Sequence, residues 1–120
     1  MTKAERAIAS AWMLLGAEDT DGACNRAYYA IFDAARAVLL SFGYEESKTH
    51  RGVINAFCDR FVKDGPFPSE MGRLFNQVET RRCLADYKGD PMEVNEAREM
   101  VEQAEAFIAA IRAEFTKIDD

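Results

Sequence analysis

The sequence predicts an all-α protein, an antiparallel bundle of four to five helices. Apolar residues recur every three to four positions along most of the 120 residues, and no segment alternates with a period of two. Short stretches rich in Gly, Pro, Asp and Ser separate the amphipathic segments, so neighbouring helices are expected to run antiparallel. The length suits a single domain over residues 1–120 that folds without disulfides or a metal.

Two helices are expected in the first third of the chain. Thr2 and Glu5 have the spacing of a capping box, and Gly16 ends the apolar pattern that follows them. A longer helix is expected from about residue 21 to Gly43, because glycine suits the position just after a helix. Many alanines in this segment favour helix and allow neighbouring helices to approach closely.

The middle of the chain predicts two more helices. One starts near Ser47 or Thr49, and the sequence Lys-Asp-Gly-Pro at residues 63–66 stops it. Ser69 is expected to cap the next helix, which ends before Gly89.

The last predicted helix begins at residues 90–93, Asp-Pro-Met-Glu. Asp90 is a favoured N-cap residue, Pro91 suits the first helical position, and Glu93 suits the first turn. Apolar residues then recur at helical spacing as far as Phe115.

The charge of the chain is −6 at pH 7, which disfavours avid general binding to nucleic acids. This charge is unevenly distributed. Residues 89–120 carry nine acidic against three basic side chains, whereas residues 48–88 carry eight basic against five acidic ones. If an anion binds, the middle of the chain is the place to expect it, although the same charges also suit ordinary solvated helix faces.

The cysteines, the N-terminus and the hydropathy all favour a cytoplasmic protein. Cys24, Cys58 and Cys83 are widely spaced and the chain has one histidine, so we expect no structural metal site and no cofactor. Free thiols point to a reducing compartment. The charged start is not followed by a continuous apolar stretch, and no apolar run approaches the length of a membrane span. We therefore expect neither a signal peptide nor a membrane segment.

Polar residues interrupt the pattern of the second helix. Asn25 and Arg26 stand directly before Tyr28 and Tyr29, so an amide and a guanidinium adjoin two phenols. His50 stands near the start of the third helix. There it either satisfies local hydrogen bonds or supplies the one imidazole of the chain for catalysis.

Arg82 interrupts the pattern of the fourth helix. The apolar positions Leu74 and Val78 continue to Arg82 at the next step of four, which places a permanent charge on the inward stripe. Such a guanidinium must be paired or must serve an anion. Asp86, four residues further on, offers an ion pair that would simply close the helix end, and Tyr87 follows it.

Five segments together resemble the HEPN superfamily, specifically its small stand-alone prokaryotic branch with an Arg-x-x-Ala-Asp-Tyr signature. In chain order they are residues 25–30 (Asn-Arg-Ala-Tyr-Tyr-Ala), 48–53 (Lys-Thr-His-Arg-Gly-Val), 61–63 (Phe-Val-Lys), 82–87 (Arg-Cys-Leu-Ala-Asp-Tyr) and 104–107 (Ala-Glu-Ala-Phe). Each segment is weak alone, but their order and spacing are fairly specific and cover nearly the whole chain.

The resemblance implies a homodimer, often paired with a minimal nucleotidyltransferase in a toxin–antitoxin or phage-defence system. Many HEPN proteins are metal-independent ribonucleases whose signature is Arg, four to six residues, then His. Arg82 matches the arginine, but Tyr87 stands at the position of the histidine. A phenol with a pKa near 10 is a poor general base at neutral pH, so His50 is a candidate substitute. A partner nucleotidyltransferase would attach a nucleotide to an exposed hydroxyl, first of all that of Tyr87.

Three functions follow from these observations. The first is a ribonuclease-type toxin with Arg82, Tyr87 and His50 as candidate catalytic residues. The second is a non-catalytic module that binds RNA or a nucleotide and partners a nucleotidyltransferase. The third is a plain helical adaptor in which the pairing of Arg82 is structural. Candidate nucleotide contacts are Asn25, Arg26 and Asp86.

Overall fold

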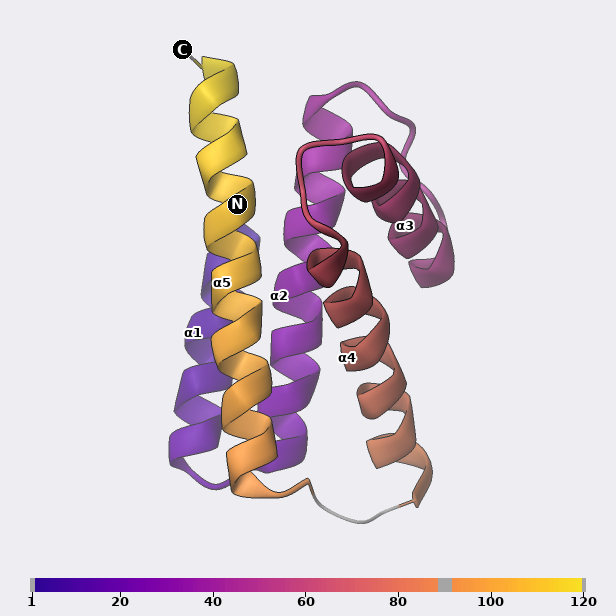
Figure 1. The fold of residues 1–120 in the computed structure, drawn as a ribbon. Coiled ribbons are helices and arrows are strands. Elements are labelled where there is room, and N and C mark those ends of the chain that lie inside the picture. Colours follow the sequence, from indigo (N-terminus) through magenta and orange to yellow (C-terminus); the bar gives the residue numbers. More distant parts are fainter. Residues whose placement is uncertain (1, 89–91, 120) are drawn as a thin grey trace.

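The computed structural model describes the backbone of residues 2–88 and 92–119, and the side chains of residues 2–82 and 92–114. These residues form helices and no strand, which confirms the predicted all-α bundle (Figure 1). The elements are α1 (Thr2–Gly16), α2 (Thr20–Ser41), α3 (His50–Phe57), the short π-helix η1 (Cys58–Lys63), α4 (Ser69–Lys88) and α5 (Val94–Asp119).

Helix α2 is the central element of the bundle. It packs against α1, α3, α4 and α5, with α1 and α5 on one side and α3 and α4 on the other (Figure 1). A helix surrounded in this way must be apolar on most of its circumference and small where its neighbours approach closely. The alanines predicted to allow close approach have this role, since all of the following are fully buried: Ala23, Ala27, Ala30, Ala34 and Ala35.

A cluster of phenylalanines forms the core between α3, η1, α4 and α5. The ring centroid of Phe57 lies 5.3 Å from that of Phe107 and 6.0 Å from that of Phe75. Phe61 and Phe67 lie 5.9 Å and 5.8 Å from the same ring. Such pairs stabilise a core beyond the burial of their area. This cluster therefore anchors the short α3 and η1 elements against the two long helices.

Side chains and one glycine set the ends of α2 and α3. Asp19 caps α2 by accepting the N–H of Gly22 at 2.9 Å. Gly43 adopts a φ of +86° after the end of α2, and its N–H and that of Tyr44 donate to carbonyls of the last turn, as expected for a glycine at this position. Of the two residues considered for the start of the third helix, Thr49 is the cap, since its Oγ1 accepts the N–H of Gly52 at 3.0 Å.

The third helix does not remain an α-helix up to residue 63. It ends as an α-helix at Phe57 and continues as the π-helix η1 over Cys58–Lys63. The chain then turns back sharply, and the N–H of Phe67 donates to the carbonyl of Phe61 at 2.9 Å. A Cβ on Gly65 would lie 2.5 Å from Cα of Phe61, so the turn requires glycine.

The start of the fifth helix was predicted too early. Residues 89–91, which include the expected cap Asp90 and Pro91, lie outside the described residues, but α5 begins only at Val94. The N–H of Met92 donates to Oδ1 of Asp21 at 3.1 Å, and Met92 is buried. This tertiary bond holds the chain at the base of α2 before the helix starts. None of the helices in the described part of the chain is long and apolar enough to cross a membrane.

Candidate functional site

An aromatic cluster on α2 packs against His50 of α3. The imidazole centroid lies 4.6 Å from the ring centroid of Phe32 and 5.8 Å from those of Tyr28 and Tyr29. All three rings belong to α2, and His50 is the first residue of α3. The half-buried imidazole of His50 therefore packs against the rings of α2.

A chain of hydrogen bonds runs from His50 through Tyr28 to Glu79. The phenol oxygen of Tyr28 lies 3.1 Å from Nδ1 of His50 and 3.4 Å from Oε2 of Glu79. Burial, and next the negative charge of Glu79, raise the pKa of Tyr28, so the phenol stays protonated and donates a hydrogen bond to the carboxylate. Because the phenol proton is used in that bond, the phenol oxygen accepts from Nδ1 of His50, and in this tautomer Nε2 carries the lone pair.

Arg51 and Asn76 hold the carboxylate end of this chain. Arg51 Nη2 forms an ion pair with Glu79 Oε1, and Arg51 Nη1 donates to Oδ1 of Asn76 at 2.8 Å. The side chain of Glu79 is only 16% exposed. A paired carboxylate that orients a phenol and an imidazole has the arrangement by which proteins position a general base.

The guanidinium of Arg82 covers the same tyrosines. Its Cζ lies 4.5 Å from the ring centroid of Tyr28 and 5.9 Å from that of Tyr29. Among the residues whose side chains the structure describes, the buried Nε finds no hydrogen-bond partner and the guanidinium no ion pair. The neighbouring Arg81, by contrast, pairs with Glu96 at 2.6 Å. Arg82 is therefore a cation suited to an anionic ligand.

Arg26 extends the site along α2. Its Cζ lies 5.9 Å from the ring centroid of Tyr29, the distance at which Arg82 approaches the same ring. Asn25 is half-buried beside it. The side chains of Asp86 and Tyr87, in the last turn of α4, lie outside the described residues, and so does the expected Arg82–Asp86 pair. The fold thus brings together three predicted site residues: Arg82, His50 and Arg26.

Comparison with known proteins assigns the family. The family model of the HEPN domain matches residues 1–114. This chain belongs to the HEPN domain family. The chain is 37% identical over 111 residues to a UPF0332 protein of Thermotoga maritima, covering 91% of this chain and 83% of that protein. It is 34% identical over 115 residues to "Putative toxin MJ0605" of Methanocaldococcus jannaschii, covering 96% and 85% of the two chains. No solved structure matches the chain significantly.

The resemblance inferred from the sequence is therefore confirmed, and two relatives of this HEPN chain carry the word toxin in their names. The second is "Putative toxin MJ0142" of the same archaeon, 32% identical over 85 residues that span 71% of this chain and 57% of the relative.

Sequence reasoning missed Glu79, which orients this HEPN site. A signal was present in the spacing. Phe75, Glu79 and Arg82 follow each other at four and three residues on α4, so they share one side of the helix. Since Phe75 is fully buried and Arg82 was already assigned an inward position, an acid between them was a candidate partner for the tyrosines of α2.

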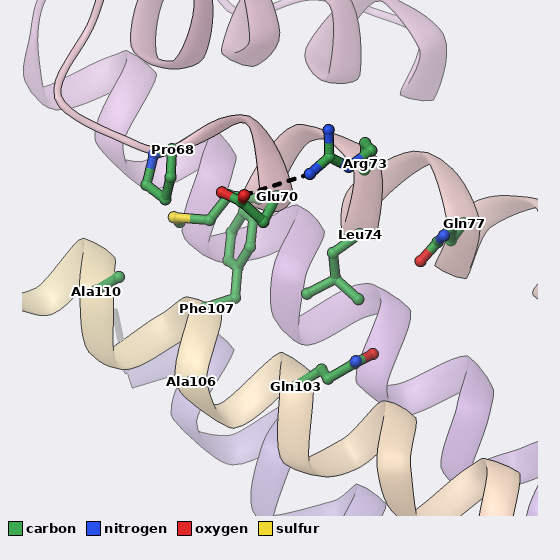
Figure 2. Close-up of a pocket in the computed structure, with 10 residues that line it drawn as sticks. Pro68, Glu70, Arg73, Leu74, Gln77, Gln103, Ala106, Phe107 and Ala110 are labelled. Atoms are coloured by element: carbon green, nitrogen blue, oxygen red, sulfur yellow. Dashed lines mark ion pairs between the residues drawn. The ribbon is translucent and has the colours of Figure 1, made fainter.

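A hollow of this HEPN bundle lies away from the site around His50, between α4 and α5 (Figure 2). It has a volume of about 470 Å³, and Leu74 and Phe107 line it from the two helices. Arg73, at its rim, pairs with Glu70 at 3.3 Å (Figure 2). Neither His50 nor Arg82, the candidate catalytic residues whose side chains the structure describes, lines this groove. Among the described residues, moreover, no group of three or more His, Cys, Asp or Glu side chains is placed to hold a metal ion.

Proposed function

We propose that this HEPN protein is a ribonuclease-type toxin or defence component that cleaves RNA with His50 and Arg82. One observation carries the proposal: His50 and Arg82 lie against the same two rings, those of Tyr28 and Tyr29. An oriented imidazole and an arginine without a carboxylate partner among the described side chains are the two groups that metal-independent RNA cleavage needs. The toxin names of two relatives support the same reading.

His50 acts as the general base. In the hydrogen-bond network described above, Nδ1 donates to Tyr28, so Nε2 is the atom that accepts a proton. It removes the proton of a ribose 2′-hydroxyl, and the resulting oxygen attacks the adjacent phosphorus. The bond to the 5′-oxygen of the next nucleotide breaks, and that oxygen takes a proton from water; the hydroxide that remains takes the proton from the imidazolium of His50, which restores the base. The products are a 2′,3′-cyclic phosphate and a free 5′-hydroxyl, and no metal takes part.

Arg82 stabilises the negative charge that develops on the phosphate oxygens. Its guanidinium can donate two parallel hydrogen bonds to a phosphate, and the face of Tyr28 fixes its approach. Removal of such a donor typically costs about a hundredfold in rate or more. Arg26 and the half-buried Tyr29 lie beside it and suit a phosphate and a stacked base of the same strand.

The family resemblance supplies the rest of the proposal. Two chains form a symmetric homodimer in which the two Arg82 sites face each other, which strengthens a site of low net positive charge. A minimal nucleotidyltransferase acts as the antitoxin and attaches a nucleotide near the site, with Tyr87 as the acceptor. The added phosphate competes for Arg82 and excludes the substrate.

The test is incubation of the purified protein with total cellular RNA in the presence of a chelator. Wild-type protein is compared with Arg82→Ala, His50→Ala and the control Arg73→Ala, which removes an exposed arginine of the same helix. We expect Arg82→Ala and His50→Ala each to lose at least tenfold in cleavage, with thermal melts close to wild type. Full activity of Arg82→Ala with an unchanged melt would show that the function lies on another face.

A second function, binding without cleavage, rests on a separate observation. Arg26 and Arg82 both approach the ring of Tyr29, and this arrangement needs no catalytic base to bind an anion. Tyr87 moreover replaces the usual histidine of the family motif. Such a site would bind RNA or a nucleotide for a nucleotidyltransferase partner. The same variants separate the two functions: in this case Arg82→Ala lowers RNA binding, wild-type protein leaves the RNA intact, and His50→Ala has little effect.

A further inference from the structure

A hollow of about 500 Å³ lies where the loop after α2 meets the first turn of α3. Phe32 and Arg36 of α2 line one side, the loop residues 46–49 line the other, and His50 completes the lining. It is a different space from the groove of Figure 2, and the cleavage mechanism uses only His50 among its residues.

The lining carries two cations and one carboxylate. Arg36 Nη1 donates to Oε1 of Glu46 at 3.0 Å, whereas Lys48 is exposed and has no ion pair with any of the side chains in the described ranges. The side chains of Arg36 and Glu46 are 33% and 54% exposed, so water screens their attraction and the pair contributes little stability. A phosphate can therefore take the place of Glu46 at Arg36 at small cost.

The loop is held in a fixed shape beside these cations. The N–H of Thr49 donates to Oγ of Ser47 at 3.4 Å, and Oγ1 of Thr49 in turn accepts the N–H of Gly52 at 3.0 Å. A Cβ on Gly52 would collide with the Ser47 side chain, so glycine lets the loop lie close against α3. Lys48 stands between these two hydroxyl residues. The cation is thus presented from an ordered loop, which lowers the entropy cost of binding.

The hollow adjoins the proposed cleavage site through His50. His50 belongs to both, since its ring lies 4.6 Å from Phe32 and its Nδ1 lies 3.1 Å from the phenol of Tyr28 that Arg82 covers. Along α2 the contacts are also unbroken, because the ring of Phe32 lies 6.3 Å from that of Tyr29 and 6.0 Å from Cζ of Arg36.

We propose that this hollow binds a second phosphate of the RNA backbone, through Arg36 and Lys48, beside the phosphate held by Arg82. The inference rests on the proposed function of the Arg82 site and specifies its substrate: a single-stranded segment of several nucleotides rather than a mononucleotide. Glu46 limits the affinity, because it occupies Arg36 when no phosphate is bound.

The test measures binding of fluorescent 2′-O-methyl RNA, which has no free 2′-hydroxyl and is not cleaved. A hexanucleotide and a dinucleotide are compared at several salt concentrations, with inorganic phosphate and AMP as competitors. The variants are Lys48→Ala, Glu46→Gln and Arg82→Ala. Lys63→Ala is the control, because it removes an exposed lysine of η1 outside the hollow.

We expect Lys48→Ala to weaken hexanucleotide binding about tenfold and to reduce the slope of log affinity against log salt by about 0.7, with little effect on the dinucleotide. Glu46→Gln is expected to strengthen hexanucleotide binding about threefold, and Lys63→Ala to change nothing. The inference is overturned if Lys48→Ala binds the hexanucleotide like wild type while Arg82→Ala does not, and the proposed function then stands. If wild type binds the hexanucleotide no better than AMP, the extended substrate is wrong. If the wild-type protein binds no RNA at all, both the second phosphate site and the proposed function are wrong.

Discussion

The phenol oxygen of Tyr28 lies 3.1 Å from Nδ1 of His50, although 22 residues separate the two in the chain. This bond joins the central helix α2 to the first turn of α3 and engages Nδ1 of the imidazole, which leaves Nε2 for another partner. It also connects His50 to Glu79, through the second hydrogen bond of the same phenol. The orientation of the proposed general base therefore depends on a single hydroxyl group.

Replacement of that hydroxyl should reduce cleavage more than stability. Tyr28→Phe keeps the buried ring under Arg82 but leaves Nδ1 of His50 and Oε2 of Glu79 without their shared partner. We expect cleavage of RNA to fall about tenfold or more and the free energy of unfolding to fall by about 1 kcal/mol. Tyr29→Phe is the matched control. The phenol of Tyr29 takes part in none of the hydrogen bonds of the described side chains, so cleavage should stay close to wild type. Equal losses in the two variants would contradict the proposed network.

The turn after η1 should tolerate no side chain at Gly65. Its Cβ would lie 2.5 Å from Cα and 2.6 Å from the carbonyl carbon of Phe61, and backbone atoms cannot move aside as a side chain can. We expect Gly65→Ala to lower the free energy of unfolding by about 2 kcal/mol, measured by urea titration. Gly16→Ala is the control, because a Cβ there meets nothing within 4 Å. That variant should change stability by less than about 1 kcal/mol. A Gly65→Ala protein as stable as Gly16→Ala would contradict the described turn.

Stability should fall at alkaline pH in part through Cys24. Burial raises the pKa of this thiol from 9.0 to about 11, and its sulfur lies 3.5 Å from that of Met100. The folded chain therefore keeps the proton where the unfolded chain has lost it. The stability that the protonated Cys24 contributes is fully present below pH 9.0 and is lost as the pH rises toward 11. The free energy of unfolding then falls by up to about 1.4 kcal/mol per pH unit. In chemical denaturation between pH 9.0 and about 11, the free energy of unfolding of Cys24→Ala should fall less steeply with pH than that of wild type. If the free energies of the two proteins fall in parallel with pH, Cys24 does not contribute to the loss.

The chain should be a homodimer in solution. Light scattering at micromolar concentration is expected to give twice the 13.5 kDa mass of one chain. A species of 13.5 kDa alone at this concentration would contradict the dimer.

Tyr87 should be the residue that a partner nucleotidyltransferase modifies. It ends the family motif five residues after Arg82, in the last turn of α4. Mass spectrometry after co-expression with a nucleotidyltransferase encoded beside this chain should show a nucleotide on Tyr87, and Tyr87→Phe should abolish the added mass. Modification of another residue, with Tyr87 unchanged, would show that this assignment is wrong. In the unmodified protein, Tyr87→His should raise cleavage by restoring an imidazole at the family position.

Periodicity and turn chemistry determined the bundle itself. The apolar repeats predicted the α-helices, the alanines of the second helix predicted that its neighbours approach closely, and Gly43 follows the end of that helix as expected. These features are local, since a helix and its ends are set by residues within one or two turns. The inward direction of Arg82 also followed from local spacing, because Leu74 and Val78 lie on the same stripe.

The tertiary structure decided everything that joins residues from different helices. The sequence left open whether His50 shares a site with Arg82, and both turn out to lie against Tyr28 because α3 and α4 pack on the same side of α2. The bond between Met92 and Asp21, which delays the start of α5, and the bond between Glu79 and Tyr28 have the same origin. Helix periodicity fixes which side of a helix a residue occupies, but not which other helix meets that side. That choice follows from packing of the whole chain, so no local pattern contains it.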